Sequence, residues 1–242
     1  MVYAIVQKEL IVPDVEQLKR AFSVSPLLTE LDAQTVFNDA YGILLRGQDA
    51  EQARLLQEAL RREQIETELV EEANLPTIPS AHVVRQLEFH PDHLVLHDPM
   101  RRTSQCPWND LMFIAAGYVT IRPGIGQDLR SAAASREADH AHAYLTLELF
   151  LHNGARYSIW ADEFDFDCLG DLLSDDRGLN FVTLIRSLAN EAPNAGQNRG
   201  AYHACLEPPE LFPYPNKAAF NEELIWMLWR IGQLKETPPP DP

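Results

Sequence analysis

The stretch PWNDLMFIAAGYV, residues 107–119, is the most apolar run of the chain, and the fold of the second half depends on it. Its strongly apolar part, from Leu111 to Val119, is nine residues long. A helix that crosses a bilayer needs about twenty, so we expect no membrane insertion. Over residues 111–116 both alternating sets of side chains are apolar, which predicts a strand covered on both faces. The pattern favours a buried strand, with Trp108 anchoring its start, over the lip of a binding site.

Antiparallel strands are predicted on both sides of this run. HVVRQLEFH (82–90) and HLVLHD (93–98) flank a turn at Pro91-Asp92. YLTLELFL (144–151) and ARYSIWA (155–161) are joined through Asn-Gly, the strongest short-range signal for a hairpin. The polar, alanine-rich stretch from Gly124 to His140, between the quoted run and the second hairpin, predicts a long loop. Two helical stretches are expected to follow, FDFDCLGDLL (164–173) and LNFVTLIRSLAN (179–190).

The first seventy residues predict a different unit, because strand and helix patterns alternate there. Pro13-Asp14, Asp32 and Asp49 each precede a run with helical apolar spacing. A helix is expected to start at Pro13-Asp14, and we expect Asp32 and Asp49 to cap the next two. The predicted order is a strand at 2–9, helices starting at Asp14 and Asp32, a strand at 43–45, a helix at 50–64 and a strand at 65–70.

This order, and the run GILLRGQDAEQARLLQEALRREQIETELV (42–70) in particular, resembles the C-terminal domain of the bacterial ribosomal stalk protein. The adaptor of the Clp protease shares that fold. The resemblance implies a small adaptor-like scaffold. Translation-factor binding does not carry over, because LDAQTVFND (31–39) is acidic where the ribosomal family is basic.

Residues 82–191 resemble a pleckstrin-homology-like barrel in its bacterial form, with several antiparallel strands, a tryptophan-led strand in CPWNDLMFIAAG (106–117) and a closing helix. That family binds lipid headgroups through basic residues of the first hairpin loop. The corresponding loop, FHPDHL (89–94), has no Lys or Arg, so we expect a protein partner and no anionic lipid.

The fold class predicted from both halves is α+β. The segment 71–80 loses periodicity and contains two prolines, which places a domain boundary there. The predicted parts are a small α/β domain at 1–73, an antiparallel β domain at 81–195, a proline-rich extension with a C-terminal helix packing on the domains at 200–235, and a disordered tail at 236–242.

Charge and cysteine content limit the classes of function. The chain has 36 acidic and 20 basic residues, a net charge of −16, which disfavours nucleic acid and anionic lipid as partners. Cys106, Cys168 and Cys205 are widely spaced and odd in number, which indicates a reducing compartment. With no basic segment or cleavage site at the N-terminus, we expect a cytoplasmic protein.

Histidines provide the one pattern that favours catalysis. His90, His93 and His97 lie close together in FHPDHLVLHD, and His140 and His142 follow in DHAHAY. Imidazole groups bind zinc and other transition metals, so a metal-dependent hydrolase is an alternative function. However, His93 and His97 are about 13 Å apart along an extended strand, too far to hold one ion by themselves. Histidines exposed at the ends of a hairpin are the simpler interpretation.

The sequence contains no G-x-S-x-G elbow, P-loop, H-E-x-x-H or C-x-x-C motif. We therefore predict a non-catalytic adaptor or protein-interaction module, with no cofactor. The C-terminal helix, NEELIWMLWRIGQL (221–234), carries apolar side chains on nearly opposite sides. One interpretation is a helix held between the two domains with Trp229 buried. The other is a helix that presents Trp226 and Trp229 to a partner, of which Trp226 is the better candidate for an exposed anchor.

Overall fold

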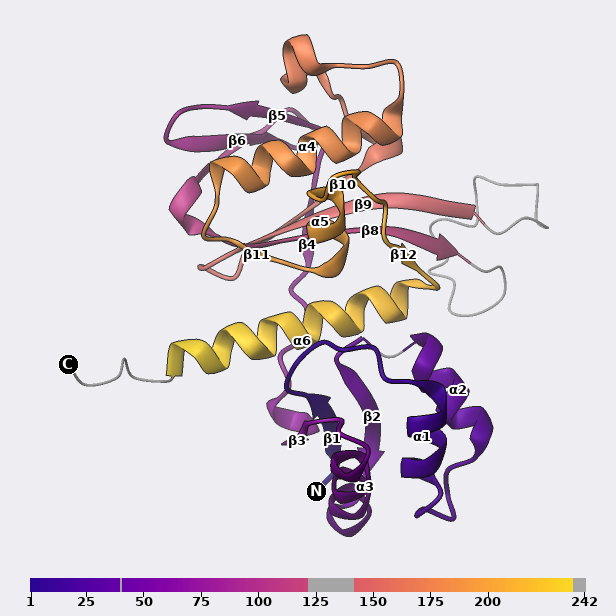
Figure 1. Ribbon diagram of the computed structural model, residues 1–242. Helices are drawn as coiled ribbons and strands as arrows, with labels where there is room; N and C mark the ends of the chain where they lie inside the picture. The colour runs from indigo at the N-terminus through magenta and orange to yellow at the C-terminus, as the bar shows by residue number, and fades with distance from the viewer. Residues whose placement is uncertain (40, 122–141, 237–242) are drawn as a thin grey trace. The chain divides into compact units, whose positions relative to one another are not determined.

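The computed structural model describes residues 1–39, 41–121 and 142–236 (Figure 1). The predicted loop 124–140 and residues 237–242 of the predicted tail lie outside these ranges. The chain divides into two compact units, one formed by Met1–Ile78 with Ala218–Pro242 and the other by Pro79–Lys217. The C-terminal helix therefore belongs to the same unit as the N-terminus.

The first unit has a three-stranded antiparallel sheet in the order β2-β1-β3. The predicted strand-helix-helix-strand-helix-strand order is confirmed. Its elements are β1 (Tyr3–Gln7), α1 (Val15–Phe22), α2 (Glu30–Asp39), β2 (Ile43–Gln48), α3 (Ala50–Arg62), β3 (Thr67–Glu71), the short 3₁₀ helix η1 (Glu72–Asn74) and α6 (Lys217–Glu236).

Side chains of β1 alternate between two apolar layers. Ile5 packs with Leu18 of α1 and Leu56 of α3 on one face of the sheet. Ala4 and Val6 belong to the other face, where tryptophan and isoleucine side chains of α6 pack against them. The sheet is thus covered on both faces, by the N-terminal helices on one and by the C-terminal helix on the other.

The predicted cap at Asp49 is confirmed. Asp14 accepts a hydrogen bond at the start of α1, and Asp49 accepts two at the start of α3. The prediction for Asp32 is wrong by one turn, because α2 begins at Glu30. Its carboxylate accepts hydrogen bonds from the backbone N–H and the hydroxyl of Thr29, both at 2.7 Å, so Thr29 is the cap and Asp32 completes a capping box.

The second unit contains a three-stranded sheet and a six-stranded sheet. The strands are β4 (Ala81–Val84), β5 (Gln86–Phe89), β6 (His93–His97), β7 (Thr103–Pro107), β8 (Leu111–Ile121), β9 (His142–Leu151), β10 (Arg156–Trp160), β11 (Gly196–Gln197) and β12 (Pro213–Tyr214). The helices are η2 (Trp108–Asp110), η3 (Ala161–Glu163), η4 (Asp167–Leu172), α4 (Arg177–Glu191) and α5 (Arg199–Ala204).

The mixed α+β class is confirmed, but the described residues form no closed barrel. The smaller sheet has the order β5-β6-β7, and the larger has the order β11-β8-β9-β10-β4 with β12 on β8. The predicted single strand at 82–90 is in fact two strands, because β4 pairs in parallel with β10 whereas β5 pairs with β6. The chain changes sheets at Arg85, whose backbone N–H donates to the carbonyl of His97 at 2.8 Å.

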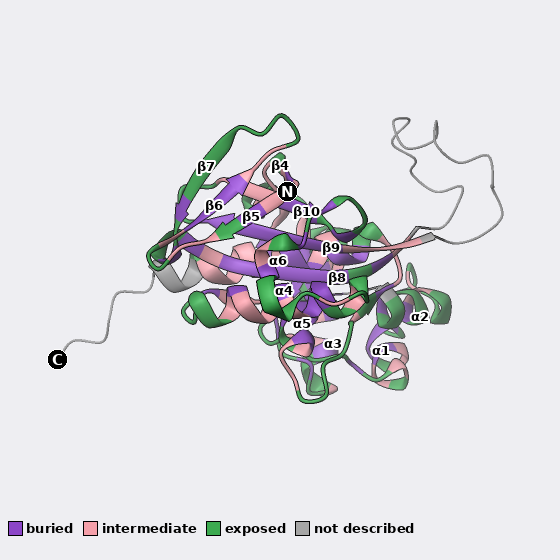
Figure 2. Ribbon diagram, turned by 90° about the horizontal axis from the view of Figure 1, so that it is seen from above, coloured by how far each residue is buried: buried purple, intermediate pink, exposed green. Residues whose placement is uncertain are grey.

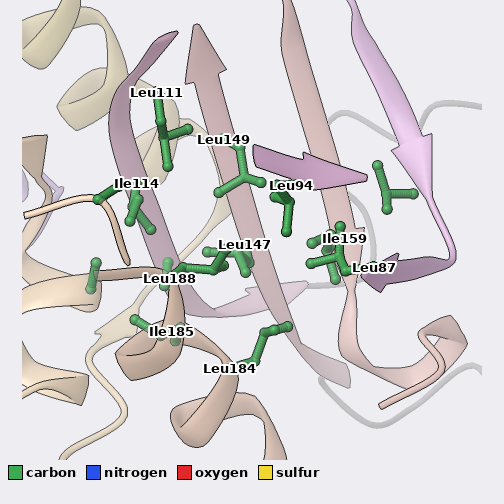
Figure 3. Close-up of a cluster of buried hydrophobic side chains, with 14 of the residues drawn as sticks. Leu87, Leu94, Leu111, Ile114, Leu147, Leu149, Ile159, Leu184, Ile185 and Leu188 are labelled. Atoms are coloured by element: carbon green, nitrogen blue, oxygen red, sulfur yellow. The ribbon is translucent and has the colours of Figure 1, made fainter. Parts of the chain in front are cut away.

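The run quoted at the start forms the centre of the second unit. Phe113 and Ile114 are neighbours on β8 and both are fully buried, so burial on two faces is confirmed (Figure 2). Trp108 is buried as predicted, and its indole N–H donates to the carbonyl of His90 at 2.9 Å. Figure 3 shows apolar side chains of β8 and β9 facing Leu184 and Ile185 of α4 in one core cluster.

Two segments adopt structure that was not predicted. β7 lacks the apolar alternation of a strand but pairs with β6 along its whole length. α5 lies in what was predicted to be an extended region. Asn198 caps it and also bonds the backbone N–H and carbonyl of Ala116 at 2.9 and 3.0 Å, which ties α5 to β8. A Cβ atom on Gly200 would overlap the Ala116 carbonyl, so glycine is needed at this contact.

Among the described residues, no helix is both long enough and apolar enough to cross a membrane.

Candidate interaction surface

The predicted histidines of the first hairpin are each paired with a carboxylate. Nε2 of His97 lies 2.7 Å from one oxygen of Glu88, and Nε2 of His90 lies 3.5 Å from the other. Nδ1 of His93 lies 2.7 Å from Asp92, and its ring stacks on that of His90 with centroids 4.7 Å apart. The hydrogen bond from His97 lowers the pKa of Glu88 below its ordinary value.

In the described ranges, no group of three or more His, Cys, Asp or Glu side chains is arranged to hold a metal ion. The side chains of His140 and His142 lie outside the described part of the chain. The hairpin instead binds its imidazoles to neighbouring carboxylates at its surface.

The three cysteines are free thiols, and their surroundings make them poor nucleophiles. Burial raises the pKa of Cys106 to about 11 and that of Cys168 to about 12. Burial also raises the pKa of Cys205. A reactive cysteine needs the opposite shift, because the thiolate is the nucleophilic form.

Both predicted partner-binding tryptophans are used inside the first unit. The indole N–H of Trp226 donates to the carbonyl of Gln7 at 2.7 Å, and that of Trp229 donates to Glu68 at 2.8 Å. Arg230 joins the same carboxylate at 3.1 Å. Both side chains are half-buried against the sheet, so Trp226 is not the exposed anchor that was expected, and Trp229 packs on the core but is only partly buried.

Polar side chains are also buried in the second unit, around Glu148 on β9. Its carboxylate accepts from Arg156 at 2.9 Å and from the Ser158 hydroxyl at 3.0 Å, and both side chains of the ion pair are almost completely buried. Burial raises the pKa of Glu148, which the Arg156 contact partly counteracts. These groups satisfy one another, so the cluster is structural.

Exposed apolar side chains gather at the N-terminal end of α4 in the second unit. Leu172 and Leu173 at the end of η4 are 64% and 46% exposed, and Leu179 of α4 is 50% exposed. Leu211 contributes from a distant segment, because its Cδ1 lies 4.0 Å from the Cβ position of Gly178. We call Leu172, Leu173, Leu179 and Leu211 the leucine surface.

Local backbone geometry holds these leucines on the outside. Gly170 has a φ of +53° and breaks η4 (orange in Figure 1), so the chain turns before Leu172. The side chain of Asn180 then accepts from the Ser174 backbone N–H at 2.8 Å and donates to the Ser174 carbonyl at 2.7 Å. This pair of bonds fastens the end of η4 to the first turn of α4.

The rim of the leucine surface is acidic. Asp171 and Asp175 are exposed, and within the described residues their carboxylates have no hydrogen-bond or ion-pair partner. Asp176 is engaged in capping α4. The arginines of α4 point elsewhere: Arg177 donates to the Ala161 carbonyl, and Arg186 donates to the Ala204 carbonyl at 2.9 Å. The surface therefore combines apolar side chains with uncompensated negative charge.

Sequence reasoning missed this surface because it predicts a helical stretch over residues 164–173 without indicating which of its side chains are exposed. The signal present in the sequence is GDLLSDD (170–176), in which a Leu-Leu pair lies between acidic residues and Gly170 comes just before the first of these. Leu211 could not be assigned to the same surface, since it lies more than thirty residues further along the chain.

Comparison with known proteins found no matching family model, no similar curated protein and no similar solved structure. The likenesses to the stalk and pleckstrin-homology folds therefore rest on the order of elements and on the residue patterns quoted above.

Proposed function

We propose that this protein is a non-catalytic interaction module that binds a partner protein through the leucine surface. The observation that carries the proposal is the exposure of four leucines on three segments that meet around the first turn of α4, where Ser174 bonds Asn180 and Leu211 lies near Gly178. Fully burying an exposed leucine contributes about 1.5–3 kcal/mol. These four are 38–64% exposed, so a partner would gain roughly half of that for each one it covered. Clustered apolar side chains with a polar rim are typical of protein interaction sites.

Other features support an adaptor role. The element order of the first unit supports a scaffold of the ribosomal-stalk type, and the two antiparallel sheets with α4 support an opened pleckstrin-homology-like arrangement in the second. Both kinds of fold bind proteins. The three free thiols agree with a cytoplasmic location.

The proposal is tested by affinity capture from the native cell extract with matched variants. Leu172→Ser/Leu179→Ser removes two members of the leucine surface and should abolish recovery of a stoichiometric partner. Leu55→Ser changes a leucine of α3 that is similarly exposed, and it should leave recovery unchanged. Equal recovery by all three proteins would overturn the proposal. Unfolding curves should be close to identical, because the substituted side chains are exposed.

A further inference from the structure

We infer that the leucine surface binds a cationic amphipathic segment, in which apolar side chains are flanked by Lys or Arg. This inference rests on the proposed function and adds the chemistry of the partner. The apolar area of the leucines can give affinity, but it does not select between a cationic and an anionic partner. The charges around the leucines make that selection.

Within the part of the chain that the structure describes, the two rim carboxylates have no cation paired with them. Asp171 lies beside Leu172, and Asp175 follows the Leu173-Ser174 pair, so acidic groups stand on both sides of the exposed leucines. Two glutamates that precede Leu211 already have partners within the chain. Glu207 is 2.9 Å from Arg186, and Glu210 is 3.3 Å from His203.

The basic residues of this region cannot supply the missing charge. The guanidinium of Arg177 donates to the Ala161 carbonyl and lies over the Phe166 ring, 5.8 Å from its centroid. That of Arg186 donates to the carbonyls of Ala204 and Leu206. Within the described residues, neither arginine of α4 is directed at Asp171 or Asp175, so we expect a partner to supply the complementary cations.

A second copy of this chain fits the surface poorly. Two leucine surfaces brought together would place Asp171 and Asp175 opposite like charges, and each chain carries a net charge of −16. Like charges facing one another across an interface are destabilising. A basic segment with leucine or aromatic anchors satisfies both the apolar centre and the acidic rim.

The test uses two synthetic fourteen-residue peptides with leucines at helical spacing, one with lysine and one with glutamate at the remaining positions. The full-length protein should bind the lysine peptide, and binding should weaken as salt rises. Leu172→Ser/Leu179→Ser should weaken it about tenfold, and Asp171→Asn/Asp175→Asn about threefold to tenfold with a smaller salt dependence. The control Glu51→Gln/Leu55→Ser alters an exposed carboxylate and leucine of α3 and should bind as the unaltered protein does.

Each outcome decides between the two proposals. If the leucine variant loses binding but the aspartate variant does not, or if the glutamate peptide binds equally well, the cationic partner is wrong and the interaction surface stands. If the control loses as much as the leucine variant, the lysine peptide binds by net charge alone and the inference fails. Sedimentation of the protein alone at about 100 µM tests whether a second copy of the chain binds to the leucine surface. A dimer that is lost in Leu172→Ser/Leu179→Ser would show that it does, and would overturn the proposal of a cationic partner segment.

Discussion

Glu148 shows how one buried residue can set the pH dependence of stability. Burial raises its pKa, so the folded chain holds this proton to a higher pH than the unfolded chain does. The free energy of unfolding therefore falls as pH rises from about 4.3, the ordinary pKa of a glutamate, through the folded value. Arg156 opposes this loss by attracting the ionised form.

Replacing Arg156 with methionine should make that loss steeper. The carboxylate of Glu148 would be buried without its cation, which costs about 3–5 kcal/mol at pH 8 and less at pH 5, where protonation removes the charge. Urea unfolding at both pH values measures the two costs. In the double variant Glu148→Gln/Arg156→Met, the loss in the free energy of unfolding should be the same at pH 5 and pH 8. A pH-independent cost for the single variant would show that the ion pair does not act as described.

At the scale of elements, the contact between α6 and β2 can be tested through two glycines. Gly42 and Gly47 both have positive φ, +89° and +74°, so alanine costs about 1–2 kcal/mol at either position. A Cβ on Gly42 would in addition overlap the Trp226 indole, whereas one on Gly47 meets nothing within 4 Å.

Gly42→Ala should therefore be the more destabilising change, by about 1–3 kcal/mol beyond the cost of Gly47→Ala. In a Trp226→Ala background this excess should vanish, since the indole that causes it is gone. The free energies of unfolding of these variants in urea give the comparison directly. If Gly42→Ala and Gly47→Ala lower the free energy of unfolding equally in the otherwise unaltered chain, Trp226 of α6 does not pack against Gly42.

Elements specified by nearby residues could be predicted from the sequence, and those specified by distant pairing could not. The helix after Asp49 and the Asn-Gly hairpin depend on a cap and a turn within a few positions. β4 is separated from β5 by its pairing with β10, more than seventy residues away. The docking of α6 on the first sheet and the meeting of Leu211 with α4 also depend on such distant contacts.

At the scale of the whole molecule, the first unit is assembled from both ends of the chain. A protease recognition sequence inserted after Thr77 would separate residues 1–77 from the fragment that carries α6. We expect the two fragments to elute together in size-exclusion chromatography after cleavage, because α6 covers one face of the β2-β1-β3 sheet. Trp226→Ala/Trp229→Ala should release them. Immediate separation of the cleaved, otherwise unaltered protein would contradict this assignment.

The leucine surface is where the molecule is expected to meet its partner, and photo-crosslinking in the cells that make the protein tests this most directly. A photoreactive phenylalanine analogue is placed at Leu179, which is half-exposed and belongs to the leucine surface. It should give one discrete adduct with a partner protein. The same analogue at Leu55 on α3 should give none. No adduct at Leu179, or identical adducts at both positions, would contradict the proposal that the leucine surface is the interaction site.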